Sequence, residues 1–300
     1  MTHVTQETAS MSPVKPEAPA RRRGRGGRVG RVRWYVYAFL IVAVLISVFP
    51  LYYMFVIASV GASAVTSIPP RLYPGLNFFD IATKVFETVP FLQSLLNSVI
   101  VSLAVAVITS LLCALAGFAF AKLQFPGRNA LFLIVLLTMT VPAQLSVIPQ
   151  YLIISWLDWV DTLQAIILPG LASAFGIFWM RQHLSTTLND ELMAAARIDG
   201  ANSWQIFWRI GFPVVRPAAF VLGLITFTGV WNDFMWPFIV LKSPELFTVQ
   251  IALKQLQANR TIDLALTMGG SFMATLPLLI VFFFVGRRMV AGIMDGAFKG

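Results

Sequence analysis

The sequence predicts an all-α polytopic membrane protein with six transmembrane helices. Of its 300 residues, 58% are hydrophobic and only 12% are charged, whereas a soluble domain is about one quarter charged. The apolar residues gather in six runs, each long enough to cross a hydrocarbon core of roughly 30 Å as a helix. The single cysteine, Cys113, lies within one of these runs, and we interpret it as a small packing residue rather than a redox group.

The segment before the first apolar run is polar and basic. Residues 1–20 are rich in Pro, Ala, Ser and Thr without periodicity, which predicts disorder. Residues 21–33 read RRRGRGGRVGRVR, and we interpret them as a cytoplasmic anchor, because Lys and Arg gather on that side of membrane spans. A nucleic-acid arm is the alternative, but this run lacks aromatic residues that stack on bases. The sequence therefore predicts a basic tail over 1–33 and a transmembrane domain over 34–300.

The six apolar runs are expected to form helices in chain order. They lie at about 35–58, 96–121, 130–150, 162–180, 215–240 and 266–290. Prolines lie within or near the ends of several runs, namely Pro50, Pro142, Pro169 and Pro237. A helical bundle tolerates such breaks because neighbouring helices satisfy the freed carbonyl groups. In the second run Cys113, Gly117 and Ala121 recur every four residues, which predicts a small-residue face where another backbone approaches closely.

The distribution of basic residues predicts the orientation of the runs. With the N-terminus in the cytoplasm, 17 of the 22 Lys and Arg residues lie on the cytoplasmic side and five lie outside. This bias predicts that both termini are cytoplasmic and that the number of spans is even. The loops at about 60–95 and 241–265 then face outward, and the polar segment 191–213 faces inward.

The polar segment ELMAAARIDGANSWQIFWRIGFP, residues 191–213, separates the fourth and fifth runs. Asp190 is expected to cap a short helix, which Gly200 ends. Ala195 and Ala196 add no bulk to this helix, so it can lie close to another surface. The segment therefore predicts a thin helix followed by a bend.

A second short helix is expected directly after the bend, with Asn202 or Ser203 as its N-cap. Its aromatic face consists of Trp204, Phe207 and Trp208. Pro213 is expected to stop this helix before the fifth run. Two functions fit the pair of helices: a linker that rests on lipid headgroups, or a docking element for a cytoplasmic partner. The alanine and glycine surface favours docking, because lipid anchoring would require bulky apolar residues on the first helix too.

The segment resembles the coupling-loop signature of permease subunits of bacterial ABC importers. That signature is close to E-A-A, three residues, G, nine residues, I-x-L-P. The matching residues are Ala195, Ala196, Gly200, Ile210 and Pro213. Phe212 replaces the usual leucine and Ala194 replaces the usual glutamate, while Glu191 lies one turn earlier and can take over part of its polar role. The resemblance implies an ATPase-coupling loop over about 183–214, whose further residues are Glu191, Asp199, Ala201 and Phe207.

The resemblance extends over about residues 34–300. Within the ABC importer permeases, the chain resembles the carbohydrate-uptake class and is similar to the smaller permease of maltose-type systems. Four further stretches carry it: ALAGFAFAKLQFPGRNALF (114–132), IILPGLASAFGIFWMRQ (166–182), WNDFMWPF (231–238) and DGAFKG (295–300). It implies a type I ABC importer permease in the bacterial inner membrane that forms half of a pathway for a sugar or sugar-like solute. The implied partners are a second homologous permease, a cytoplasmic ATPase dimer and an extracytoplasmic solute-binding protein, with lipid around them and no nucleic acid.

The sequence contains no residue pattern typical of an enzyme. The two histidines, His3 and His183, form no metal-ligand spacing with the lone cysteine, and no G-x-x-x-x-G-K-[ST] phosphate loop is present. We therefore expect a transporter subunit that binds no cofactor, with ATP and magnesium used by a separate ATPase. Two alternatives stay open: a membrane scaffold that recruits a partner without transport, and an importer permease for a non-sugar solute.

Asp233 is the acidic residue placed within a predicted span. Acidic side chains inside a membrane are costly and often mark a solute path. One interpretation is that Asp233 pairs with a neighbouring helix and orients it. The other is a polar lining that suits hydroxyl-rich ligands, formed by Trp231, Asn232, Asp233 and Trp236.

Overall fold

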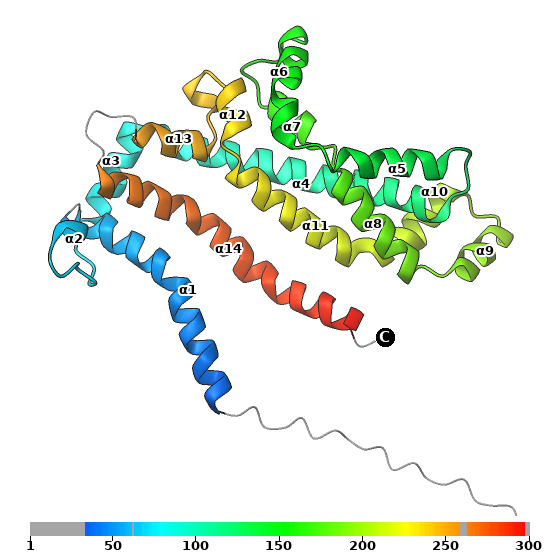
Figure 1. The fold of residues 1–300 in the computed structure, drawn as a ribbon, viewed down its shortest axis with the longest axis horizontal. Helices are drawn as coiled ribbons and strands as arrows, with labels where there is room; N and C mark the ends of the chain where they lie inside the picture. The colour runs from blue at the N-terminus through cyan, green and yellow to red at the C-terminus, as the bar shows by residue number, and fades with distance from the viewer. Residues whose placement is uncertain (1–33, 62, 258–262, 298–300) are drawn as a thin grey trace, which may run out of the picture. The chain divides into compact units, whose positions relative to one another are not determined.

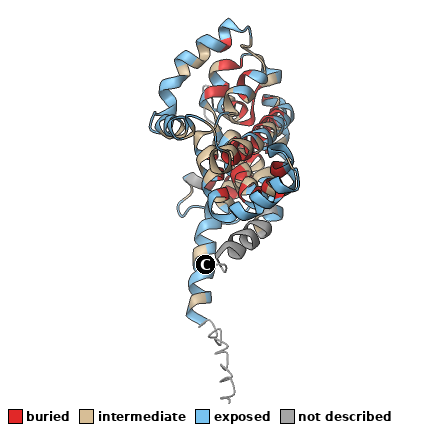
Figure 2. Ribbon diagram, turned by 90° about the vertical axis from the view of Figure 1, so that its right-hand side faces the viewer, coloured by how far each residue is buried: buried red, intermediate tan, exposed pale blue. Residues whose placement is uncertain are grey.

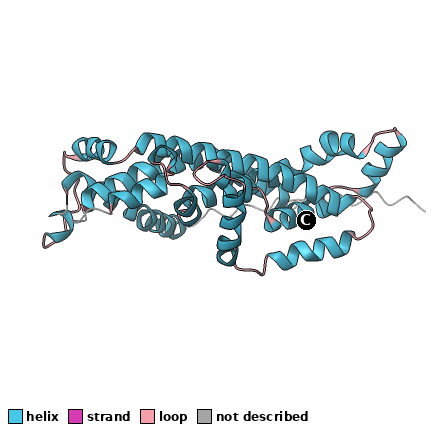
Figure 3. Cartoon of the chain, turned by 90° about the horizontal axis from the view of Figure 1, so that it is seen from above, coloured by secondary structure: helices cyan, strands magenta, loops and turns pink. Residues whose placement is uncertain are grey.

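Helices form the regular elements of the chain, and no strand occurs among the residues that the structure describes (Figures 1 and 3). The computed structural model describes residues 34–61, 63–257 and 263–297. The predicted basic tail over 1–33 and the end of the DGAFKG stretch lie outside the described residues. The chain divides into two compact units, residues 1–47 and 48–300.

The first unit is described only through the start of α1 (Trp34–Val60), which continues into the second unit. This helix is apolar around its whole circumference, and its residues up to the last two turns are largely exposed. Pro50 lies within it without ending it. A helix that is apolar on every side requires lipid or protein around it.

The second unit contains the remaining helices. In chain order they are α2 (Ser63–Thr66), α3 (Phe78–Thr88), α4 (Phe91–Lys122), α5 (Arg128–Thr138), the 3-10 turn η1 (Ala143–Ser146), α6 (Val147–Trp156), α7 (Gln164–Gly170), α8 (Ala174–Thr187), α9 (Asp190–Ile198), α10 (Ser203–Ile206), the π turn η2 (Phe207–Gly211), α11 (Phe212–Asn232), α12 (Met235–Val240), the 3-10 turn η3 (Pro244–Leu246), α13 (Val249–Leu256) and α14 (Leu264–Ala297).

The predicted class is confirmed, with a refinement in how the spans are built. Four helical stretches are by themselves long and apolar enough to cross a membrane: Trp34–Val60, Phe91–Lys122, Ser203–Asn232 and Leu264–Phe284. Two bent pairs bring the number to six if each pair is one span, and they are α5 with η1 and α6, bent by 96°, and α7 with α8, bent by 41°. The bend in the third predicted run lies at Pro142, where a missing N–H and a restricted preceding residue disfavour continued helix.

The prediction for the fifth span was wrong at both ends. Its helix runs over Ser203–Asn232 rather than 215–240, and Pro213 does not stop it. The Phe212 N–H donates to the carbonyl of Phe207, five residues earlier, so a π turn carries the chain through the proline without ending the helix. Pro213 then lies in the first turn of α11, where its missing N–H costs little. Asp233 lies just beyond this helix, not within it.

The small-residue face predicted on the second run is confirmed at the contact between α4 and α8. A Cβ added at Gly117 would lie 2.5 Å from the Cβ of Met180 and 2.8 Å from the backbone nitrogen of Arg181. Cys113 is buried, and its Sγ would lie 2.5 Å from a Cβ added at Gly176 on α8. These distances leave no room for larger residues, so α4 and α8 touch through their backbones. Cys113 is a packing residue, as the sequence predicts.

Large apolar side chains cover much of the surface of the second unit. Helices α4 and α11 pack on each other and on α8, and many of their buried residues belong to one core cluster. Figure 2 shows the buried positions inside the group of helices and exposed positions around it. Helices α4 and α5 also expose Leu103, Val107, Leu133 and Leu137. Apolar surface of this extent fits contact with lipid or with another subunit.

Asp161 joins the α6–α7 loop to the loop after α12. Its carboxylate accepts hydrogen bonds from the backbone N–H groups of Lys242 (2.8 Å) and Ser243 (2.9 Å) and from the Ser243 hydroxyl. These hydrogen bonds, the Ser243 hydroxyl first, lower the pKa of the Asp161 carboxyl below its ordinary value. The loop between Trp156 and Gln164 is thereby tied to the segment that follows α12.

Asp161→Ala is expected to lower the thermal midpoint of the detergent-solubilised protein at neutral pH. The expected loss is about 1 kcal/mol, because one of the three hydrogen bonds is exposed to solvent and the other two are only partly buried. Asp158→Ala is the matched control, since Asp158 also has a positive φ but its carboxylate accepts no hydrogen bond from the described residues. The lowered pKa means that the contribution exists at neutral pH and disappears as the pH falls through the folded-state pKa. Equal midpoints for the two variants at pH 7 would contradict this assignment.

Candidate functional site

Helix α9 begins with an asparagine cap. Asn189 has extended backbone angles, and its Oδ1 accepts a hydrogen bond of 3.0 Å from the N–H of Glu191. The prediction of Asp190 as the cap was therefore wrong by one residue, because Asp190 already has helical geometry. Asp190 and Glu191 occupy the first turn instead, where negative charge is favourable.

Asp190 connects α9 to the end of α4. Its carboxylate lies 2.7 Å from the Nζ of Lys122, whose side chain is only 6% exposed. The hydrogen bond from Lys122, followed by its charge, lowers the pKa of the Asp190 carboxyl. The start of α9 is thus fastened to a helix of the bundle core.

Gly200 ends α9 in the left-handed conformation, as the sequence predicts, with φ = +81°. Its N–H donates to the carbonyl of Arg197 (3.0 Å), and the N–H of Ala201 donates to the carbonyl of Ala196 (2.9 Å). This pair of bonds is the Schellman arrangement. A Cβ at position 200 would meet nothing within 4 Å, so glycine is required by backbone conformation rather than by space.

The second helix starts two residues later with a capping box. The Oδ1 of Asn202 accepts from the N–H of Gln205, and the Oε1 of Gln205 accepts from the N–H of Asn202, both at 2.9 Å. Of the two predicted caps, Asn202 is the one used. The bend between the two helices consists of Asp199 to Asn202, and hydrogen bonds fix it at both ends.

Two sides of α9 have different surroundings. Met193 and Ala196 are buried against the core of the bundle, at 4% and 9% exposure. The prediction that Ala196 belongs to a thin exposed surface was wrong, because its side chain packs inward. The exposed side, called here the α9 outer face, consists of Asp190, Glu191, Leu192, Ala194, Ala195, Arg197, Ile198 and Asp199.

The remaining residues of the predicted coupling loop hold the segment on the bundle. Phe207 is 1% exposed, and its ring lies 5.4 Å from that of Phe118 on α4. Ala201 and Ile210 are half-buried against the same core, while Pro213 is exposed. Phe207 and Ile210 therefore anchor α10 and η2, and the α9 outer face is left free for another surface.

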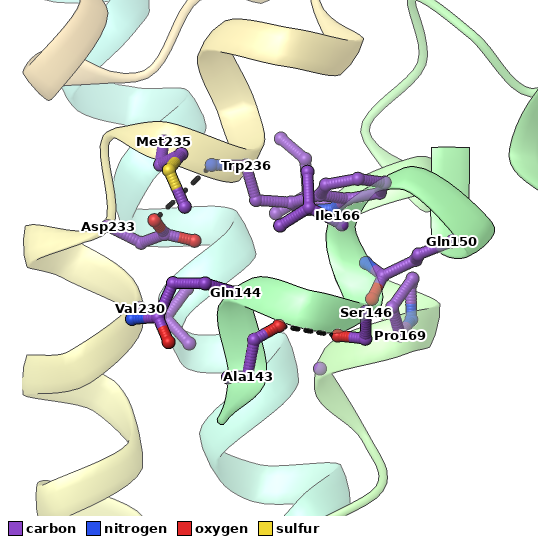
Figure 4. A pocket seen from close by; sticks show the side chains of 12 residues that line it. Ala143, Gln144, Ser146, Gln150, Ile166, Pro169, Val230, Asp233, Met235 and Trp236 are labelled. Atoms are coloured by element: carbon purple, nitrogen blue, oxygen red, sulfur yellow. Dashed lines mark hydrogen bonds between the residues drawn. The ribbon is translucent and has the colours of Figure 1, made fainter. Parts of the chain in front are cut away.

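A second candidate region lies where α11 ends and α12 begins. A pocket of about 310 Å³ lies beside Asp233, and it is lined from η1, α6, α7, α11 and α12 (Figure 4). Its lining residues are Ala143, Gln144, Ser146, Val147, Gln150, Ile166, Pro169, Gly170, Val230, Asp233, Met235 and Trp236. The pocket therefore forms at the bend of the third predicted run and at the break after α11.

Asp233 and Trp236 occupy one wall of this pocket. The carboxylate accepts a long hydrogen bond of 3.4 Å from the backbone N–H of Trp236. The Trp236 indole donates through Nε1 to the carbonyl of Ala165 at 3.0 Å, which fixes the ring against α7. Figure 4 shows the carboxylate on the side of the pocket that faces Gln144 and Ser146.

The four predicted path residues separate in the structure. Asp233 and Trp236 line the pocket, but Trp231 is buried at 2% exposure against Phe227, in another cluster. Asn232 is exposed and donates to the carbonyl of Thr228 (2.8 Å), one helical turn back. Trp231 and Asn232 therefore do not line this pocket, because neighbours on a helix point in different directions.

The sequence interpretation missed the polar residues on the opposite wall, which are Gln144, Ser146 and Gln150. The signal was present as two glutamines within the run VPAQLSVIPQ, close to Pro142. A polar side chain next to a helix break within an apolar run is typical of a lined cavity, because irregular backbone is tolerated in a membrane only there or within protein.

Comparison with known proteins decides the family. Residues 106–291 match the family described as the inner membrane component of binding-protein-dependent transport systems. The chain belongs to that family. It is the permease subunit of an ABC importer, and both candidate regions lie within the matched residues.

Several curated permeases are similar along most of their length. The chain is 32% identical to the arabinooligosaccharides transport system permease protein AraQ of Bacillus subtilis, covering 83% of this chain and 92% of that protein. It is 34% identical to the lactose transport system permease protein LacG of Rhizobium radiobacter, covering 86% and 93%. It is 32% identical to the sn-glycerol-3-phosphate transport system permease protein UgpE of Pectobacterium atrosepticum, covering 85% and 94%.

Solved structures share the fold of this permease. One chain of a bacterial ABC transporter involved in the import of the acidic polysaccharide alginate superposes with a TM-score of 0.72 and 25% identity, covering 85% of this chain and 95% of that one. A chain of a bacterial alginate ABC transporter in complex with an alginate pentasaccharide-bound periplasmic protein has a TM-score of 0.58 and 17% identity, covering 84% and 92%. These likenesses confirm the predicted all-α type I importer permease fold.

Proposed function

We propose that this permease forms half of a translocation pathway for a sugar or sugar-like solute, driven by a separate cytoplasmic ATPase dimer. A second homologous permease forms the other half, and an extracytoplasmic solute-binding protein delivers the solute. The permeases AraQ and LacG, named for sugar transport, support the solute class. This chain binds no cofactor in the proposal, and the ATPase uses ATP and magnesium.

The α9 outer face is the observation that carries this proposal. It is exposed, it is followed by a bend fixed by hydrogen bonds, and it is fastened to the bundle through Lys122 and Phe207. It exposes the apolar side chains of Ile198 (87%) and Leu192 (49%), together with the acidic Glu191 and Asp199 and the basic Arg197. Such a surface fits a groove on a partner that is apolar at its floor and carries charged residues of both signs at its rim.

Coupling follows from the way this face is held. Helix α9 is joined to α4 by the Lys122–Asp190 pair, and beyond the bend α10 continues through η2 into α11, so a displacement of this segment is transmitted to the spans. ATP closes the ATPase dimer, the docked α9 moves with it, and the bundle shifts between inward-open and outward-open states. The permease thus converts a movement at its cytoplasmic side into access for the solute.

The proposed orientation places both termini in the cytoplasm and the segment 191–213 on the cytoplasmic side of the inner membrane. Leu76→Cys, at a residue that is 95% exposed, is expected to react with an impermeant thiol reagent added outside intact cells. Ser203→Cys is also exposed but is expected to react only after the membrane is permeabilised. The buried Cys113 serves as the unreactive background. The reverse labelling pattern would overturn the orientation.

ATP-driven uptake tests the proposed function. The complete complex, with binding protein, is reconstituted in vesicles and supplied with radiolabelled lactose or arabinooligosaccharides, with and without ATP. ATP-dependent accumulation that is lost when this chain is omitted supports the proposal. A complex that retains and stimulates its ATPase but accumulates no solute, sugar or other, supports the alternative of a membrane scaffold. Accumulation of non-sugar solutes only would reject the sugar class.

A further inference from the structure

We infer that the pocket beside Asp233 admits uncharged, hydroxyl-rich solutes and rejects anionic ones. The inference rests on the proposed function and names its solute class more narrowly. Family membership alone leaves this choice open. The permeases similar to this chain include ones named for lactose and arabinooligosaccharides, which carry no charge, and one named for sn-glycerol-3-phosphate, which is an anion.

The charge of the lining carries the inference. Asp233 is the one ionisable side chain among the residues that line the pocket in the described part of the chain, and the lining holds no Lys, Arg or His. A phosphate or carboxylate group in this space would lie near a carboxylate without a counter-ion. Like charges within one pocket repel each other, and juxtaposed like charges are a common means of rejecting a wrong ligand.

The neutral polar groups of the lining suit hydroxyls. The side-chain amides of Gln144 and Gln150 make no hydrogen bond to other described residues, so each offers both a donor and an acceptor. The Asp233 carboxylate accepts one long bond, from Trp236, and retains acceptor capacity for a hydroxyl. A sugar hydroxyl both donates and accepts, so it can satisfy all of these groups at once.

The remaining lining provides an apolar wall of suitable size. Trp236 is held by its bond to Ala165, and Ile166, Pro169 and Val230 contribute carbon surface. The flat carbon face of a sugar ring packs on such a wall. A volume of about 310 Å³ lies at the low end of small-molecule pockets, so the site fits a small solute or one unit of a longer chain.

A matched pair of ligands tests the inference without the binding protein. Lactose and lactobionate have nearly the same size, but lactobionate carries a carboxylate and has its glucose ring opened, so the Asp233 variants below are needed to separate the effect of charge from that of shape. Met235→Cys, at a pocket residue that is 45% exposed, in a Cys113→Ala background, provides a thiol whose modification by a maleimide is followed in the purified full-length permease complex. Lactose is expected to protect this thiol at a concentration at least tenfold lower than lactobionate.

Two substitutions test whether the Asp233 carboxylate causes the preference for lactose over lactobionate. Asp233→Asn is expected to bring the two protecting concentrations within about threefold, whereas Asp233→Glu should retain the preference for lactose. ATPase retention and the thermal midpoint of both variants verify that they are assembled. Equal protection by the two ligands with Asp233 present, better protection by lactobionate, or protection by neither overturns the inference. If the reconstituted complex imports no solute but lactose still protects the thiol better than lactobionate, the proposed function is rejected and the selective pocket is retained. If the complex imports solute but protection is not selective, only the inference about the pocket is rejected.

Discussion

Gly200→Val is expected to produce a permease that inserts in the membrane but loses its ATPase on purification and no longer imports. Position 200 has φ = +81°, which a β-branched residue adopts only at a cost of about 1–2 kcal/mol. If the backbone at position 200 leaves the left-handed conformation, the hydrogen bonds from the N–H groups of residues 200 and 201 to the end of α9 are broken. The α9 outer face then turns away from its docking position. A loss of about 1.4 kcal/mol at the contact corresponds to tenfold weaker binding.

The control for this variant is Gly200→Asn, because asparagine tolerates the left-handed conformation. A Cβ meets nothing within 4 Å at this position, so the first side-chain atom of either residue is accommodated without a clash. The asparagine variant is expected to retain most of its ATPase in co-purification, and the valine variant to retain a tenth or less. Equal retention by the two variants would show that the conformation of this bend does not matter for docking.

Gly117→Val is expected to have the largest effect on folding. Its added Cβ would lie 2.5 Å from the Cβ of Met180 and 2.8 Å from the nitrogen of Arg181, and backbone atoms cannot move aside as a flexible side chain can. Separating α4 from α8 also exposes the core around Cys113, so a loss of about 4 kcal/mol or more is expected. The measurement is the yield and thermal midpoint of monodisperse protein extracted in detergent.

Gly229→Val is the control for Gly117→Val, because Gly229 lies in α11 and a Cβ there meets nothing within 4 Å. It is expected to give a yield close to that of the unchanged protein, with a cost or gain from helix propensity below about 1 kcal/mol. A normal yield and midpoint for Gly117→Val would show that α4 and α8 are not in backbone contact.

Features that depend on a few neighbouring residues could be predicted from the sequence. The glycine that ends α9 and the Asn202 cap follow from local backbone chemistry, and the stripe of Cys113 and Gly117 follows from helical periodicity. The six apolar runs follow from composition. Their predicted ends differ from the observed helix ends where an irregular turn, such as a π turn, continues a helix. The π turn at Phe207–Gly211 has no sequence signal that we recognised, and it is why Pro213 continues a helix instead of ending it.

Features that depend on distant segments could not be predicted. Ala195 and Ala196 are identical in sequence terms, and only the position of α9 on the bundle decides that Ala196 is buried and Ala195 exposed. The pocket is a similar case. Its residues come from segments between Ala143 and Trp236 that the bend at Pro142 brings together, and no local pattern specifies the angle of that bend.

Site-directed cross-linking at α9 tests the central claim most directly. Ala195→Cys and Ala196→Cys, each in a Cys113→Ala background, differ by one position and by exposure. The complete complex is treated with a short bifunctional thiol reagent, with a single cysteine scanned along the groove of the ATPase subunit. We predict a permease–ATPase adduct from Ala195→Cys and none from Ala196→Cys. No adduct from position 195 at any scanned position, in a complex that imports solute, would contradict the account that the α9 outer face docks on the ATPase.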